Sequence, residues 1–81
     1  MNESIEVPYL ERKRQLNKKR NREIIISAAK DTFTKMGVDK SSIRQITKIT
    51  NLGSGTFYNY FRNKNSIFIV INERFVQEFS E

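Results

Sequence analysis

Apolar and small residues recur in the middle of the chain with the spacing of an α-helix. Between residues 25 and 36 they fall at intervals of three and four, along one stripe of a helix: Ile25, Ala28, Ala29, Thr32, Phe33 and Met36. Gly37 follows directly, and glycine commonly ends a helix because it adopts a positive φ without strain. The pattern predicts a first helix over about residues 18–36.

A capping signal marks the start of a second helix. The Ser42 hydroxyl can accept a hydrogen bond from the backbone N–H of Gln45, whose side chain can reach back to the backbone of Ser42. Isoleucines follow at helical spacing. The pattern ends at Asn51, the residue type that, after glycine, best tolerates the left-handed conformation of a tight turn. We expect this helix over about residues 42–50.

A third helix, short and polar, follows the turn. Phe57 and Phe61 are spaced i and i+4 and share one face, which predicts that both point inward. Tyr58 and Tyr60, two residues apart, point to different sides, so at least one of their hydroxyls should face solvent. We expect this helix over about residues 53–61.

A fourth helix follows Asn63, a suitable N-cap, and should run from Lys64 to about Phe79. It carries more apolar side chains than one buried face of so small a unit can hold: Ile67, Phe68, Val70, Ile71, Phe75, Val76 and Phe79. Apolar surface outside a small domain usually belongs to a partner or to another domain. We therefore assign residues 65–81 to a connecting helix toward a dimerisation or effector domain absent from this chain.

Together these elements predict an all-α fold, with a three-helix helix-turn-helix domain over residues 18–64 and a fourth connecting helix. Residues 1–17 are either a polar and basic arm or an extension of the first helix, and the pattern leaves both open. Pro8 either ends that arm or occupies the first turn of a helix, where its missing N–H does no harm.

The distribution of charge indicates a polyanionic partner. The chain of 81 residues has 15 Lys and Arg against 9 Asp and Glu, a net charge of +6. Residues 12–64 hold 14 basic and 3 acidic residues, a net charge of +11, whereas residues 1–11 carry −3 and residues 65–81 carry −2. A basic centre of this kind is typical of proteins that bind nucleic acid.

Composition argues against several other classes. The chain has no Cys and no His, which removes the thiolate nucleophile, sulfur-bound zinc and the commonest general base. We expect no enzyme, no metal and no cofactor. The N-terminus lacks the pattern of a signal peptide, and no stretch approaches the roughly 18 apolar residues of a membrane span. The expected location is the bacterial cytoplasm, associated with the nucleoid.

Two helices joined by a tight turn form a helix-turn-helix, whose second helix enters the major groove of DNA. Candidate contacts lie on that helix: Ser54, Gly55, Thr56, Tyr58, Asn59 and Tyr60. Helix N-termini and cations bind phosphate, which suggests anchors on either side of the reading helix: Ser41, Ser42, Arg44 and Lys64. A basic arm along a groove would add Lys18, Lys19, Arg20 and Arg22.

The segment from about Arg22 to Phe68 resembles the DNA-binding domain of TetR-family transcriptional regulators. Its most specific part is Gly-Thr-aromatic-Tyr-x-x-Phe-x-x-Lys at residues 55–64. The resemblance implies three N-terminal helices, the third for recognition, and a fourth that leads to a ligand-binding and dimerisation domain. It also implies DNA contacts at five positions: Ser42, Arg44, Thr56, Tyr58 and Lys64.

The chain departs from the family pattern around the second helix. Asn51 stands in place of the usual turn glycine and Gly53 in place of the usual serine cap, while Thr47 and Thr50 replace the usual alanines. We expect these departures to weaken the second helix and the cap of the third without changing the topology.

The leading hypothesis is a sequence-specific, dimeric transcriptional regulator, a repressor, that binds a palindromic double-stranded operator. The homodimer would form through a region mostly outside this chain, and a small-molecule effector would bind only a longer form. One alternative is a truncated competitor that pairs with a full-length homologue through the fourth helix. Another is an interfacial membrane peptide, which the breaks at Gly37, Asn51 and Gly53 disfavour.

Overall fold

The described part of the chain folds into four helices and contains no strand, which confirms the all-α prediction. The computed structural model describes the backbone of residues 3–79 and the side chains of residues 8–77. Residues 1–2, predicted in the N-terminal segment, and residues 80–81, predicted in the connecting helix, lie outside the described residues. The side chain of Phe79 also lies outside the described side chains. The helices are α1 (Glu3–Met36), α2 (Ile43–Thr50), α3 (Ser54–Tyr60) and α4 (Lys64–Phe79).

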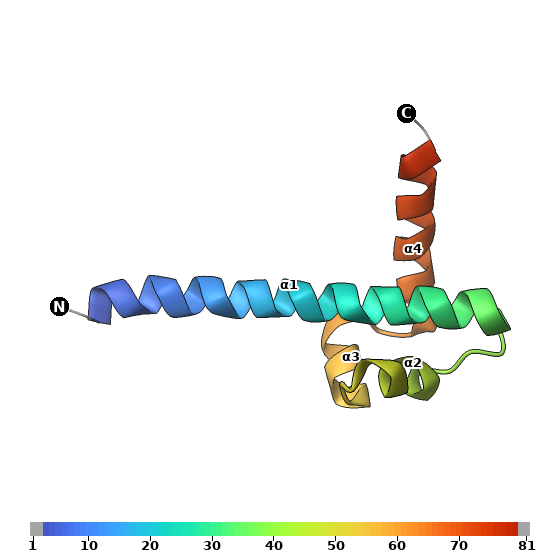
Figure 1. Cartoon of the computed structure of the whole chain (residues 1–81), viewed down its shortest axis with the longest axis horizontal. Coiled ribbons are helices and arrows are strands. Elements are labelled where there is room, and N and C mark those ends of the chain that lie inside the picture. The colour runs from blue at the N-terminus through green and yellow to red at the C-terminus, as the bar shows by residue number, and fades with distance from the viewer. Residues whose placement is uncertain (1–2, 80–81) are drawn as a thin grey trace.

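Figure 1 shows α1 as a long rod with α2 and α3 packed against one side of its C-terminal half. Helix α4 runs across α1 and projects away from α2 and α3. The N-terminal half of α1 extends well beyond the other helices, so the molecule measures 53 × 35 × 18 Å along its principal axes.

Helix α1 is longer than the expected span of about residues 18–36. It continues back to Glu3, so the basic N-terminal segment is an extension of the first helix. No glycine or proline interrupts residues 9–36, and an uninterrupted segment of this kind can continue a helix that is already nucleated. Pro8 lies within α1 as its sixth residue, beyond the first turn, where it donates no hydrogen bond to the preceding turn.

The residues predicted to end or cap the helices do so in the structure. Gly37 has a φ of +82°, and its N–H donates to the carbonyl of Phe33 at 2.8 Å. Asn51 has a φ of 62° and ends α2 in the left-handed conformation. Asn63 caps α4, because its Oδ1 accepts a hydrogen bond from the N–H of Ser66 at 2.9 Å.

Helix α3 is slightly shorter than expected. Gly53 occupies its N-cap without a side-chain hydrogen bond, as the absence of a serine there predicts. Phe61 follows the last turn in an extended conformation, while its N–H donates to the carbonyl of Phe57 at 3.0 Å. The chain therefore turns sharply between α3 and α4.

All four helices contribute to one small hydrophobic core. Its buried apolar members are Ile25, Ile26, Ala28, Ala29, Ile46, Phe57, Phe61 and Ile67. The inward orientation of Phe57 and Phe61 is confirmed, with ring centroids 5.8 Å apart. Met36, expected on the core stripe, is 40% exposed because α1 ends there, beyond the helices that cover its middle. The core holds the helix pair α2–α3 against α1.

Candidate nucleic-acid interface

Helix α3 turns most of its polar residues away from the core. Four of its residues are exposed: Ser54, Gly55, Tyr58 and Asn59. Tyr58 is 56% exposed, although its ring still meets that of Phe57 edge-on at a centroid distance of 5.6 Å. Thr56 is half-buried. These side chains supply the hydroxyl and amide groups that hydrogen-bond to bases and phosphates in a major groove.

Tyr60 does not belong to this outward surface. Tyr60, predicted to contact DNA, is half-buried and packs against the core cluster. Tyr58 and Tyr60 point to different sides of α3, so Tyr60 faces the core when Tyr58 faces solvent. The exposed side of α3 is therefore formed by Ser54, Gly55, Tyr58 and Asn59.

The N-terminus of α2 is open to solvent and well ordered by its own side chains. The Ser42 hydroxyl accepts from the N–H of Gln45 at 3.1 Å, and Oε1 of Gln45 accepts from the N–H of Ser42 at 2.9 Å. This reciprocal pair is the predicted capping box. Ser42 and Arg44 are both exposed, and the first turn of α2 contains no acidic residue that would repel a phosphate.

Ser41, expected to anchor a phosphate beside Ser42, is buried with 4% of its surface exposed. Its hydroxyl donates to the carbonyl of Gly37 at 2.5 Å, and its N–H donates to the carbonyl of Val38 at 3.2 Å. Ser41 therefore closes the turn between α1 and α2, and its hydroxyl is not presented to a ligand.

Lys64, predicted to contact a phosphate, binds the protein backbone in this structure. Its Nζ donates to three backbone carbonyls of the loop between α1 and α2: those of Val38 at 2.7 Å, Asp39 at 3.1 Å and Ser41 at 2.9 Å. A lysine ammonium has three N–H donors, and in this arrangement the loop uses all of them.

The basic residues of α1 divide into two groups. Lys18, Lys19 and Arg20 are exposed on the helical extension. Arg22 is half-buried, and its guanidinium lies 5.2 Å from the centroid of the Phe61 ring, within the range of a cation–π contact. Arg22 thus packs against the helix-turn-helix and is not a free member of the basic group.

Two further cations near α3 were not among the predicted contacts. Lys48 is exposed in the last turn of α2, and Arg62 is exposed directly after α3. Each is basic and adjoins the turn or the reading helix, so position and charge together are the signal that identifies them. Both suit contacts with the DNA backbone.

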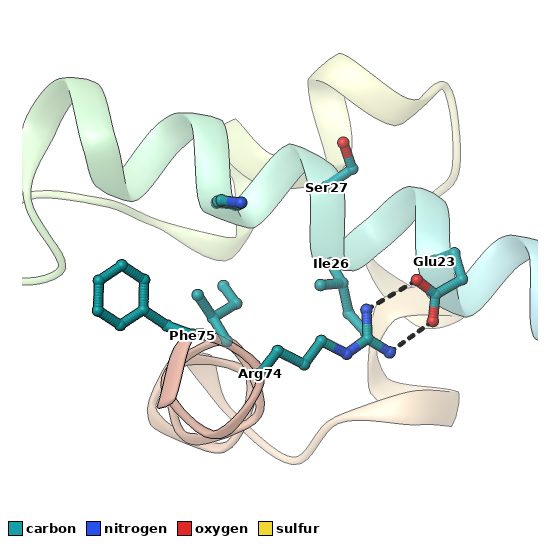
Figure 2. Close-up of a pocket in the computed structure, with 7 residues that line it drawn as sticks. Glu23, Ile26, Ser27, Arg74 and Phe75 are labelled. Carbon is teal, nitrogen blue, oxygen red and sulfur yellow. Dashed lines mark hydrogen bonds and ion pairs between the residues drawn. The ribbon is translucent and has the colours of Figure 1, made fainter. Parts of the chain in front are cut away.

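An ion pair joins α1 and α4 and is drawn with dashed lines in Figure 2. No local sequence pattern indicates it. Arg74 donates to Glu23 through Nη1–Oε1 at 2.8 Å and Nη2–Oε2 at 2.6 Å. The hydrogen bond and positive charge of Arg74 lower the pKa of Glu23 below its ordinary value. The pair borders a hollow of about 260 Å³ lined by Glu23, Ile26, Ser27, Lys30, Ile71, Arg74 and Phe75.

The exposed residues of α3 and of the N-terminus of α2 form a surface that suits binding of a polyanion. Among the described residues, no cluster of carboxylates is arranged to hold a metal ion. None of the helices in that part of the chain combines the length and apolar character that a membrane crossing requires.

Comparison with known proteins identifies the family. Residues 25–71 match the family described as bacterial regulatory proteins, tetR family. The chain is 30% identical over 60 residues to the uncharacterized HTH-type transcriptional regulator YhgD of Bacillus subtilis (strain 168), an alignment that covers 74% of this chain and 31% of that protein. It is 41% identical over 51 residues to the uncharacterized HTH-type transcriptional regulator YvdT of the same strain, covering 63% of this chain and 26% of that protein.

The chain thus aligns with about a third or less of the length of these two relatives. Comparison with the solved structures gives no match. The family match covers more than half of the chain and includes all of α2 and α3. The chain therefore belongs to the tetR family of helix-turn-helix transcriptional regulators.

Proposed function

We propose that this chain binds double-stranded DNA in a sequence-specific manner, with α3 in the major groove, and that it acts as a transcriptional repressor. The observation that carries the proposal is the exposed polar side of α3 beside the open N-terminus of α2. Tyr58 and Asn59 are exposed on α3, and Ser42 and Arg44 are exposed at the start of α2. Both helices lie on the same side of α1 (Figure 1).

Each group has a distinct task in this proposal. Asn59 and Thr56 read base edges, since an amide can pair with adenine and a threonine can bond to any base through its hydroxyl. Tyr58, Ser42 and Arg44 bind phosphates and fix the register of α3 in the groove. Ser54 and Gly55 lie at the N-terminus of α3, where the absence of a Cβ at residue 55 allows close approach to the DNA.

The repressor acts as a homodimer in this proposal, and its operator is palindromic. Two copies of α3 would occupy half-sites about one helical turn apart and exclude polymerase from the promoter. The relatives extend well beyond the aligned region, so most of the dimer interface and any effector site belong to a longer form. The protein would work at the chromosome, in the bacterial cytoplasm.

One observation favours a second function. Ile69 and Val76 on α4 are 57% and 61% exposed, which leaves apolar surface available to another chain. The second candidate is a short competitor that pairs with a full-length homologue through α4 and weakens the DNA binding of that homologue. Mixing the two chains and measuring the mixed dimer would separate this candidate from an independent repressor.

The test of the main proposal is selection of duplexes from a random pool with this chain, followed by affinity measurements at several salt concentrations. A repeated, palindromic sequence is the expected product. The logarithm of the binding constant should fall linearly with the logarithm of the salt concentration, by about 0.9 for each phosphate neutralised. Selection without enrichment, or affinity that ignores salt, would reject the proposal.

A further inference from the structure

Lys64 ties the start of α4 to the loop that precedes α2. Its Nζ is surrounded by the carbonyl oxygens of Val38, Asp39 and Ser41, at 2.7, 3.1 and 2.9 Å. These partners are 23 to 26 residues away in the sequence, so the contact joins two separate parts of the fold. Lys64 is half-buried, which protects these charged hydrogen bonds from full exposure to water.

The loop that Lys64 holds leads directly into the proposed phosphate anchors. The carbonyl of Ser41 accepts a hydrogen bond from Lys64, and the next residue, Ser42, is the N-cap of α2. Arg44 follows in the first turn of α2. At the other end of the contact, Lys64 begins α4 only a few residues after α3 ends. The ammonium group therefore fixes the N-terminus of α2 relative to the end of the reading helix.

The number of hydrogen-bond donors on Lys64 distinguishes its contact with the loop from direct contact with DNA. An ammonium group has three hydrogens and no acceptor, and three carbonyls already receive them. Contact with a phosphate would require Lys64 to release at least one carbonyl of the loop. In the observed arrangement the positive charge faces the protein backbone.

We propose that Lys64 is a positioning residue for DNA binding, which holds Ser42 and Arg44 in register with α3 by binding the carbonyls of the α1–α2 loop. The inference rests on the proposed function and adds to it a residue that acts on DNA only through others. Loss of the ammonium group would leave the phosphate-binding side chains present but misplaced.

The central experiment compares Lys64→Met with wild type in two measurements. Hydrogen exchange of the amides in residues 38–42 should be faster in the variant, because the loop loses its tie to α4. Duplex affinity should fall about tenfold, the equivalent of one charge-assisted hydrogen bond, while the slope against salt stays unchanged. Lys40→Met removes a charge from the same loop at an exposed position and should leave loop exchange as in wild type.

A phosphate contact predicts the opposite pattern. Lys64→Met would then lower the salt slope by about 0.9 and leave loop exchange unchanged. Lys64→Arg sharpens the distinction, since arginine binds phosphate at least as well as lysine, but its planar group does not fit three carbonyls around one nitrogen. Positioning predicts that Lys64→Arg also lowers affinity, and full affinity in this variant would overturn the proposal.

A double-mutant cycle with Arg44→Gln distinguishes positioning from a general loss of stability. If Lys64 acts through the N-terminus of α2, the substitution of Arg44 should weaken binding less in the Lys64→Met background than in wild type. Additive effects, measured where both variants are fully folded, would overturn the positioning role. If wild type binds no duplex, the proposed function fails, whereas the exchange measurement still decides whether Lys64 holds the loop.

Discussion

Glu23 of α1 and Arg74 of α4 are joined by two parallel hydrogen bonds of 2.8 and 2.6 Å, across 51 residues of sequence. The planar guanidinium matches both carboxylate oxygens, which makes this the best-defined ion pair between two helices in the described part of the chain. It adds a polar contact between α1 and α4 to the apolar packing of Phe33 against Phe68.

This ion pair makes stability depend on acidity. Arg74 lowers the pKa of Glu23 from its ordinary 4.5, so the stabilisation is present above that value and is lost as the pH falls through the lower folded-state value. Glu23→Gln should reduce the free energy of unfolding near neutral pH by less than about 1 kcal/mol, because both groups are partly exposed. Near pH 3 the difference should be much smaller.

Thermal unfolding followed by circular dichroism at both pH values measures this effect. Glu11→Gln provides the control, since the Glu11 carboxylate lies 3.9 Å from Arg14 of the same helix and this ion pair joins no second element. A difference between wild type and Glu23→Gln that persists unchanged at low pH would show that the ion pair does not stabilise the fold.

The turn between α2 and α3 should respond differently to two substitutions of Asn51. Asn51 has a φ of 62°, which glycine adopts freely and alanine does not. Asn51→Ala should lower the free energy of unfolding by about 1 kcal/mol, whereas Asn51→Gly should leave it nearly unchanged. Urea denaturation measures both, with Lys48→Ala, in the last turn of α2, as a control. Equal stability of the two Asn51 variants would contradict the conformational argument.

Tyr58→Phe should weaken binding to all duplexes by a similar factor. The substitution keeps the ring that meets Phe57 and removes only the hydroxyl of a side chain that is 56% exposed. The free energy of unfolding should therefore change by less than about 0.5 kcal/mol. Parallel titrations of the selected operator and an unrelated duplex measure the effect. A decrease confined to the operator would mean that the Tyr58 hydroxyl reads a base.

Asn59→Ala should change sequence preference more than overall affinity. Asn59 is exposed on α3, and an amide that pairs with a base discriminates by about 1–3 kcal/mol at that position. Duplex selection repeated with the variant should relax one position in each half-site while the rest of the operator is retained. An unchanged selected sequence would exclude Asn59 as a base-reading residue.

The fold was largely predictable because its signals are local. Gly37, the Ser42–Gln45 capping box, Asn51 and Asn63 each act within one turn of helix, where sequence spacing and spatial proximity coincide. The pair Phe57 and Phe61 was predictable for the same reason, since helical periodicity places both on one face.

The parts of the site that depend on contacts between helices were not predictable in this way. The burial of Ser41 and the engagement of Lys64 follow from the path of the loop, which the spacing of residues does not specify. Tyr60 packs inward because of how α3 is rotated against the core. The pairing of Glu23 with Arg74 joins residues 51 positions apart, and many other charges are equally available in the sequence.

The extension of α1 should bind DNA backbone with only one of its faces. Among the described side chains of α1 the first buried one is Ile25, so residues 3–24 precede the core and span roughly 33 Å at 1.5 Å per residue. Arg14, Lys18 and Arg22 are spaced four residues apart, so they lie on one face of α1. The core residues that follow Arg22 lie on the same face. The core residues on that face pack against α2 and α3, and α3 is the helix that we propose enters the major groove.

A charge-matched pair of variants tests this orientation. Arg14→Gln with Lys18→Gln should lower the salt slope of duplex binding by up to about 1.8, which is 0.9 for each phosphate that is no longer neutralised. Arg12→Gln with Arg20→Gln removes the same charge from another face of the helix, because Arg12 and Arg20 each lie two residues, or about 200°, from Arg14 and Lys18 respectively. This pair should change the salt slope much less. Equal effects would indicate that the extension attracts DNA only through its net charge. An unchanged slope in the first variant would show that this face of the extension does not contact the duplex, because Arg14 and Lys18 supply the charge with which it would bind phosphate.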